Sequence, residues 1–270
     1  MAVSNNITGA LNFVAMVLSV PIIGTGIWLA TREDAECVRV LRWPLIVVGT
    51  ILLLISFAGF VGAFWRVQYL LVIYLIFMLL FIVLLLAFVI FAFIVTNKGG
   101  GHSVPGRNYK EYQISDFSGW LRNYVEKSSH WNRIERCLSS SDVCRKLNQR
   151  YLSAQDFFNA HLTPAESGCC KPPTFCGYTF VNPTFWVSPT NQNADLDCMV
   201  WSNDQLQLCY NCNSCKAGIL GNIKREWKKI NIILIVALVA LIWVYLVGCS
   251  AFRNAQTEDL FRRYKERFTS

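Results

Sequence analysis

The sequence has few of the residues on which soluble domains and enzymes depend. Charged residues make up 16% of its 270 residues, whereas a typical soluble domain has about 25%. Its 3 histidines are His102, His130 and His161, and no pattern combines a nucleophile, a base and an orienting group. We therefore expect no enzyme, and neither a cofactor, a metal site nor a small-molecule substrate.

Charge is scarcest in four long apolar runs, at residues 7–30, 44–64, 70–95 and 230–252. Each run is close to the roughly 20 residues that cross a bilayer core as a helix. Only helices and closed barrels satisfy their backbone groups in lipid, so each run predicts a transmembrane helix. The expected fold class is an all-α membrane protein. Four transmembrane helices form a bundle, and a large, disulfide-rich and mostly helical loop joins the third helix to the fourth.

The remaining segments are short except for one loop. We expect residues 1–6, 65–69 and 253–270 to be cytoplasmic, and residues 31–43 and 96–229 to be extracellular. The first apolar run lacks the basic residues that precede a cleaved signal peptide, and it is long for one. It is therefore expected to stay in the bundle as a transmembrane helix.

Ten of the 11 cysteines fall on one side of this layout. They are Cys37, Cys137, Cys144, Cys169, Cys170, Cys176, Cys198, Cys209, Cys212 and Cys215. Such a density indicates disulfides, which form in an oxidising compartment. Nine loop cysteines cannot all pair with each other, so we expect Cys37 to bridge to the large loop, with the connectivity open. Arg32, Arg39 and Arg42 oppose an outer small loop by the positive-inside rule, but the cysteines favour it.

The cysteines also allow a rival interpretation. Cys209, Cys212 and Cys215 are spaced like ligands of a zinc or iron–sulfur site on the cytosolic side. Such a site would leave Cys169 and Cys170 without a role, so disulfides are favoured. Neighbouring cysteines seldom bridge each other, and we expect Cys169 and Cys170 to reach separate partners.

Hydrophobic periodicity predicts helices within the large loop. Apolar residues recur at helical spacing over 116–138, which indicates one amphipathic helix. Shorter helices are expected over 153–161 and after 163–166, each behind a capping sequence. A last helix over 216–229 should run directly into the fourth span. Residues 171–204 are rich in proline and asparagine and depend on disulfides for their order.

Polar and small residues inside the spans indicate where the helices pack. Asn12 is the lone amide of the first span and should turn inward, because polar groups at that depth pair with another helix. Ser56, Gly59 and Gly62 recur every three residues and allow helix backbones to approach closely. Cys249 lies at the inner end of the fourth span and is a candidate for palmitoylation.

The net charge of +8 is spread over the chain, so we expect no nucleic-acid partner. In the tail, the acids Glu258, Asp259 and Glu266 offset the basic residues of the run 262–267. We therefore expect a solvated tail rather than one bound to anionic lipid.

The segment Gly168-Cys169-Cys170-Lys171-Pro172 stands in the loop between the third and fourth spans. In this setting it resembles the motif of the tetraspanin family, and a glycine before the cysteine pair resembles the plant branch. The resemblance covers essentially the whole chain. It implies a small and a large outer loop, and four helices that spread apart to leave a cavity open to lipid.

The function that the resemblance implies is a non-enzymatic organiser of the plasma membrane, linked in plant relatives to cell differentiation and development. Its partners would be membrane lipids, sterol among them, and other membrane proteins, including tetraspanins in homo- or hetero-oligomers. The alternative is a cell-surface receptor that binds an extracellular ligand through the aromatic-rich residues 175–201. A channel or transporter would need intramembrane charges, which the spans lack.

Overall fold

The computed structural model describes residues 2–31, 36–65 and 68–269. The chain forms two compact units. The membrane unit comprises Met1–Ile90 and Ile232–Ser270, and the loop unit comprises Phe91–Asn231. Two long helices, α3 and α10, each contribute to both units.

The apolar runs of the sequence lie on α1 (Ala2–Thr31), α2 (Glu36–Phe64), α3 (Gln68–Asn97) and α10 (Asn213–Thr269). Each of these helices contains a stretch long and apolar enough to cross a membrane. The stretches are Asn6–Trp28, Ile46–Phe64, Tyr69–Asn97 and Asn213–Asn254. This confirms the predicted four-helix membrane fold. The predicted borders between spans and loops stay a prediction, because α2 and α10 continue as helices beyond the apolar residues.

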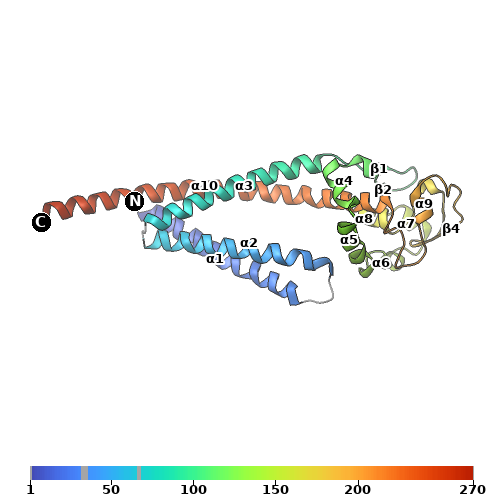
Figure 1. Ribbon diagram of the computed structural model, residues 1–270, viewed down its shortest axis with the longest axis horizontal. Helices are drawn as coiled ribbons and strands as arrows, with labels where there is room; N and C mark the ends of the chain where they lie inside the picture. The colour runs from blue at the N-terminus through green and yellow to red at the C-terminus, as the bar shows by residue number, and fades with distance from the viewer. Residues whose placement is uncertain (1, 32–35, 66–67, 270) are drawn as a thin grey trace. The chain divides into compact units, whose positions relative to one another are not determined.

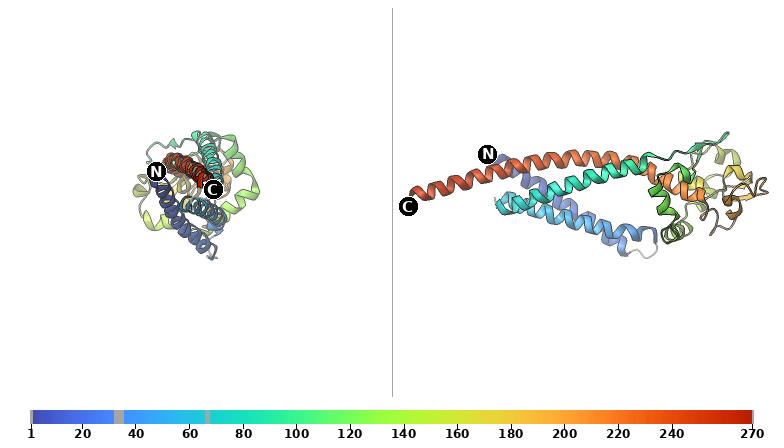
Figure 2. Two further views of the ribbon diagram at one scale, coloured as in Figure 1. Left: turned by 90° about the vertical axis from the view of Figure 1, so that its left-hand side faces the viewer. Right: turned by 45° about the horizontal axis from the view of Figure 1, so that its top comes forward.

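Within the membrane unit, α1 and α2 lie side by side along their length (Figure 1), and both views in Figure 2 agree. Gly62 and Ala63 of α2 are buried near Leu71 of α3, close to the turn that joins the two helices. Farther from that turn, α2 and α3 diverge (Figures 1 and 2). Most of the large apolar side chains on these helices are exposed, as surfaces that face lipid require.

The loop unit is mostly helical, with two small antiparallel hairpins. Its elements before α10 are β1 (His102–Ser103), β2 (Lys110–Glu111), η1 (Ile114–Asp116), α4 (Gly119–Glu126), α5 (Ser128–Ser140), α6 (Arg145–Arg150), α7 (Ala154–Phe158), α8 (Pro164–Cys169), η2 (Thr174–Cys176), β3 (Thr179–Asn182), β4 (Phe185–Val187) and α9 (Leu196–Val200). β1 pairs with β2, and β3 pairs with β4. One hydrophobic core joins these elements to the first turns of α10, where Ala217 and Leu220 are fully buried.

Residues 116–138 do not form the single helix that their periodicity predicts. The helix is broken at Lys127, which is extended between α4 and α5. The last core residue of α4 is Val125, and the first of α5 is Trp131. In one continuous helix, six positions would leave these side chains pointing about 120° apart. The break restores a common direction, so both helices bury their apolar side chains in the same core.

Two of the short helices begin at their predicted caps. The Ser153 hydroxyl accepts a hydrogen bond from the Asp156 N–H at the start of α7. At the start of α8, Thr163 and Glu166 each accept a bond from the other's backbone N–H, which completes a capping box. As predicted, α10 runs without a break from the loop unit into the fourth span.

Residues 171–204, which show no periodicity, contain the β3–β4 hairpin. Phe180 pairs with Trp186 across the two strands. Both rings contact the fully buried Phe157 of α7, with ring centroids 5.5 Å and 6.2 Å away. This aromatic packing holds the hairpin against the helices, in addition to the disulfides.

Candidate functional site

The adjacent cysteines of the motif form disulfides with separate partners. Cys169 is bonded to Cys215 at the start of α10, and Cys170 is bonded to Cys144, which directly precedes α6. All four cysteines are buried. The N–H of Cys209 also donates to the Cys169 carbonyl oxygen at 3.2 Å. The end of α8 is therefore the point where two distant segments of the loop unit are joined covalently.

Glycine at position 168 is required by close packing between α8 and α10. A Cβ atom on Gly168 would clash with the Ser214 carbonyl oxygen, and one on Gly218 would clash with the Pro164 carbonyl oxygen. Gly168 of α8 and Gly218 of α10 therefore face each other where the two helices cross, and the absence of side chains lets the two backbones come into contact. The Cys169–Cys215 bond fixes this crossing.

Lys171 of the motif is buried although it carries a charge. Its ammonium group forms an ion pair with Glu111 of β2. It also donates to the Pro172 carbonyl oxygen at 3.2 Å and lies 4.8 Å from the centroid of the Tyr109 ring. Because a buried charge is costly unless it is paired and hydrogen-bonded, these contacts explain how lysine is tolerated there.

The carboxylate of Glu111 is held by two residues. Besides Lys171, the Thr174 N–H and hydroxyl donate to it, at 3.0 Å and 2.6 Å. Burial alone would raise the pKa of Glu111. The Lys171 charge and the hydrogen bonds from Lys171 and Thr174 together outweigh burial, so its pKa lies below the usual value. Glu111 is therefore ionised, and its ion pair with Lys171 connects β2 to the motif.

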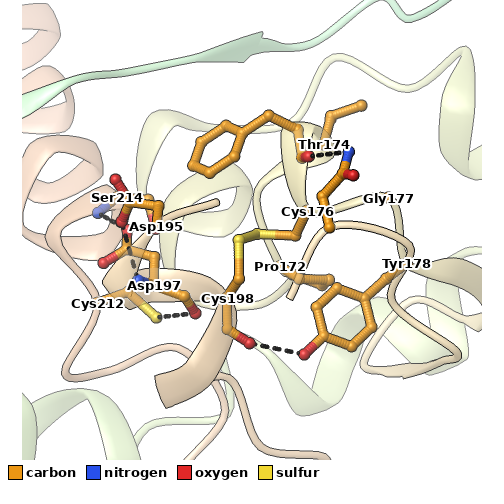
Figure 3. The surroundings of a disulfide bond; sticks show 12 residues. Pro172, Thr174, Cys176, Gly177, Tyr178, Asp195, Asp197, Cys198, Cys212 and Ser214 are labelled. Carbon is orange, nitrogen blue, oxygen red and sulfur yellow. Dashed lines mark hydrogen bonds between the residues drawn. A yellow bond between two sulfur atoms is a disulfide. The ribbon is translucent and has the colours of Figure 1, made fainter. Parts of the chain in front are cut away.

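A third disulfide, between Cys176 and Cys198, closes the segment that follows the motif. Figure 3 shows this bond, with the Tyr178 hydroxyl donating to the Cys198 carbonyl oxygen at 2.8 Å. Next to it, the buried carboxylate of Asp197 accepts from the Ser214 N–H at 2.7 Å (Figure 3). Asp197 thereby caps α10, where unpaired N–H groups favour a negative charge.

The fourth described disulfide joins Cys209 to Cys212. With Cys215 bonded to Cys169, all three sulfurs of the rival metal interpretation are in disulfides. Those three cysteines cannot then act as thiolate ligands. The side chain of Cys37 lies outside the described residues, so its predicted bridge to the loop stays a prediction.

In the membrane unit, Asn12 turns toward another helix. Its amide donates to the Thr8 carbonyl oxygen at 2.9 Å and to the Tyr74 hydroxyl of α3 at 3.3 Å. A Cβ atom on Gly59 of α2 would lie 2.6 Å from the Asn12 side-chain oxygen and 2.7 Å from the Tyr74 ring. Gly59 therefore makes room for a polar contact between α1 and α3, while Ser56 is buried one turn earlier.

Two further features of the membrane unit bear on lipid. Cys249 on α10 is a free, partly buried cysteine, and its palmitoylation stays a prediction.

A cavity of about 330 Å³ opens between α2 and α3. It is lined by Ile51, Leu54, Ile55, Ala58, Ile73, Tyr74 and Phe77. Apart from the Tyr74 hydroxyl this lining is apolar, so its chemistry suits a lipid chain.

The loop unit has a cavity of about 260 Å³ beside the motif. Its lining includes Glu111, Tyr112, Gly168, Thr174 and Phe175. Its wall combines the aromatic residues Tyr112 and Phe175 with Glu111, whose carboxylate is ionised. It overlaps the aromatic-rich segment predicted as a binding face only at Phe175.

Several large apolar side chains of the loop unit are exposed within residues 175–206, a segment that includes the Cys176–Cys198 disulfide and ends just before the Cys209–Cys212 disulfide. They are Phe175, Val181, Phe185, Leu196, Met199 and Leu206, and each is at least 41% exposed. We call these six residues the outer apolar set. Single exposed apolar residues are normal, but many within one segment are typical of a surface that binds another molecule.

Three residues that support these sites were missed by sequence reasoning. Glu111, Asp197 and Tyr74 each bind a group that is far away in the chain. The acids stand in polar segments where a solvated surface is the default interpretation. Tyr74 stands in an apolar run where its hydroxyl does not alter the hydrophobic signal. The one available signal was Asn12 itself, which required a polar partner on another span.

Comparison with known proteins agrees with this architecture. The model of the tetraspanin family matches residues 4–251. The chain is 57% identical to Protein TORNADO 2 of Arabidopsis thaliana, over the full length of both chains. It is 56% identical to Tetraspanin-2 of the same plant, with 98% of this chain and 99% of the relative covered, and 46% identical to Tetraspanin-8, with 96% of each covered. The chain belongs to the tetraspanin family, and plant proteins are among its relatives.

Proposed function

We propose that this protein is a non-enzymatic organiser that clusters other membrane proteins and lipids in the plasma membrane, in the control of plant cell differentiation and development. The observation that carries the proposal is the outer apolar set, which a disulfide-bonded unit presents on the four elements η2, β3, β4 and α9 and on the turn after α9. A rigid unit loses little conformational freedom on binding, which favours recognition of a folded partner.

The proposed orientation places both termini in the cytoplasm and the loop unit outside the cell. Four described disulfides support it, since the cytosol keeps such thiols reduced. A protease added to intact cells should cut within residues 96–229 and spare a C-terminal tag. Loss of the tag under these conditions would reverse the orientation.

The membrane unit supports the lipid part of the proposal. The cavity between α2 and α3 is apolar with a single hydroxyl at its wall. This chemistry suits a molecule with a long hydrocarbon body, so we propose sterol or an acyl chain as its occupant. Other tetraspanins would pack against the exposed apolar faces of the spans, as homo- or hetero-oligomers.

Proximity labelling in plant tissue tests the organiser role. We expect Phe185→Ser combined with Met199→Ser to remove most labelled membrane-protein partners while surface level stays unchanged. Gln192→Ala, an exposed polar position in the same segment, is the control and should keep them. If the double variant retains every partner, the outer apolar set is not the binding surface.

A receptor for a soluble extracellular ligand is the second candidate, and the 260 Å³ cavity beside the motif favours it. Its prediction differs from that of the organiser. Purified full-length protein would bind a fractionated extracellular extract saturably, and Phe175→Ser at the cavity wall would abolish that binding. The Phe185→Ser and Met199→Ser changes would leave it intact.

A further inference from the structure

The C-terminal end of α10 carries an exposed apolar stripe beyond the fourth span. The apolar stretch of the helix ends at Asn254, but the helix continues to Thr269. Leu260, Phe261, Tyr264 and Phe268 follow at helical spacing, and each is at least 64% exposed. The rings of Tyr264 and Phe268 lie 4.5 Å apart, so these residues share one face of the helix.

The helix sorts the charges of the tail in a way that a net count does not reveal. At about 100° per residue, Lys265 and Arg267 lie at the two edges of the stripe. Asp259 and Glu266 lie on the opposite side, whereas Glu258 lies only about 20° around the helix from Lys265. Two of the three acids of the tail therefore lie away from the stripe, and only Glu258 stands near its basic edges. The solvated tail expected from composition neglects this separation.

We propose that residues 257–268 form an interfacial helix that lies on the anionic surface of the membrane. The stripe enters the boundary between headgroups and acyl chains, and the basic residues at its edges meet lipid phosphates and carboxylates. In the structure α10 is continuous through Arg253 and Asn254, where the apolar stretch ends, and the proposal requires the helix to bend there when the tail meets the membrane. An apolar face rich in aromatic residues and flanked by basic ones is typical of helices that lie in the membrane interface.

The occupant is a lipid surface rather than a second protein helix because of where the charges lie. Partner helices in a coiled coil are selected by complementary acidic and basic residues beside the apolar seam. Here Lys265 and Arg267 place a basic residue at each edge of the stripe. Glu258 beside Lys265 leaves the sum of these edge charges positive, so two copies of the tail would repel. Anionic lipid attracts both edges at once.

The test uses the full-length protein in nanodiscs. In a Cys249→Ser background, Tyr264→Cys places a thiol-reactive NBD fluorophore in the stripe, and Glu266→Cys places it on the opposite side. The discs contain phosphatidylcholine alone or with phosphatidylserine as the minor component, together with a lipid quencher spin-labelled near the headgroup. With phosphatidylserine, we expect label 264 to shift to the blue and to be quenched, and label 266 to stay water-like. High salt should weaken the difference.

Two further variants test whether the stripe causes the quenching, and three outcomes would show that the tail does not lie on the anionic membrane surface. Phe261→Ser combined with Phe268→Ser should abolish quenching of label 264, and Gln256→Ser should not. The proposal is wrong if label 264 stays water-like with phosphatidylserine. It is also wrong if the label is shielded without lipid quenching, which indicates a protein contact, or if it is buried equally without phosphatidylserine. Both leaflets of the disc are alike, so the result does not depend on the orientation or the partners proposed above.

Discussion

The ammonium group of Lys171 is buried against the carboxylate of Glu111, which lies 60 positions earlier in the chain. Glu111 belongs to the β1–β2 hairpin, and Lys171 follows the cysteine pair directly. The ion pair therefore ties the start of the loop unit to the same point that two disulfides join to α10 and to the segment before α6. In this chain the lysine of the motif has a structural role that can be measured.

Lys171→Met should destabilise the loop unit by about 3–5 kcal/mol, because it leaves the Glu111 carboxylate partly buried without its charge partner. Pulse proteolysis of the full-length protein in urea, scored by cleavage within residues 96–229, measures the change. Lys229→Met is the matched control, since its ion pair with Glu226 is exposed and should contribute at most about 1 kcal/mol. Equal effects of the two variants would contradict a special role for Lys171.

The same pair predicts how acid acts on the loop unit. The pKa of Glu111 is lowered in the folded protein, from an ordinary value of 4.5. Its contribution to stability is therefore complete above pH 4.5 and is lost as the pH falls through the lowered native pKa. We expect the urea midpoint to fall on acidification, and Glu111→Gln to remove part of that fall. An unchanged acid dependence in the variant would mean that other carboxylates dominate.

Cysteine parity predicts a bridge between Cys37 and Cys137. The four described disulfides use eight of the nine loop cysteines, Cys137 is also disulfide-bonded, and Cys249 is free. Peptide mapping of the unreduced protein should find Cys37 and Cys137 in one cross-linked peptide. A free thiol at Cys37 would show that Cys137 has another partner.

Gly59→Val should weaken the packing of the membrane unit. Its Cβ atom would meet Asn12 and Tyr74 at 2.6–2.7 Å, and overpacking of this kind typically costs about 1–3 kcal/mol. We expect a lower thermal midpoint in detergent. Gly24→Val is the control, because nothing lies within 4 Å of a Cβ atom there. Similar thermal midpoints for both variants would show that the contact between Asn12 and Tyr74 does not require glycine at position 59.

The features that the sequence predicted well depend on local or averaged properties. Bilayer thickness sets the length of an apolar run, so the four spans could be predicted from composition. Ser153 and Thr163 cap their helices through residues three positions away, which makes them visible in a short segment. The break at Lys127 was missed because the periodic pattern persists on both sides of it. Only the shared core requires the change in direction.

The features that the sequence could not predict depend on contacts between distant segments. Cys176 lies much nearer to the motif in the sequence than Cys144 does, yet the fold pairs Cys170 with Cys144, 26 positions away, and Cys176 with Cys198. Glu111 has no local signal that marks it as the partner of Lys171.

The central claim is that disulfides hold a loop unit that binds membrane partners. Cys170→Ser breaks the bond to Cys144, and a disulfide typically contributes about 2–4 kcal/mol of a domain's total stability of roughly 5–15 kcal/mol. Cys249→Ser removes a free thiol and is the control. The decisive measurement is the surface level of each variant together with its co-purified membrane partners. We predict retention in the secretory pathway and loss of partners for Cys170→Ser, and normal values for Cys249→Ser. A Cys170→Ser protein at wild-type surface level with its partners bound would contradict the claim.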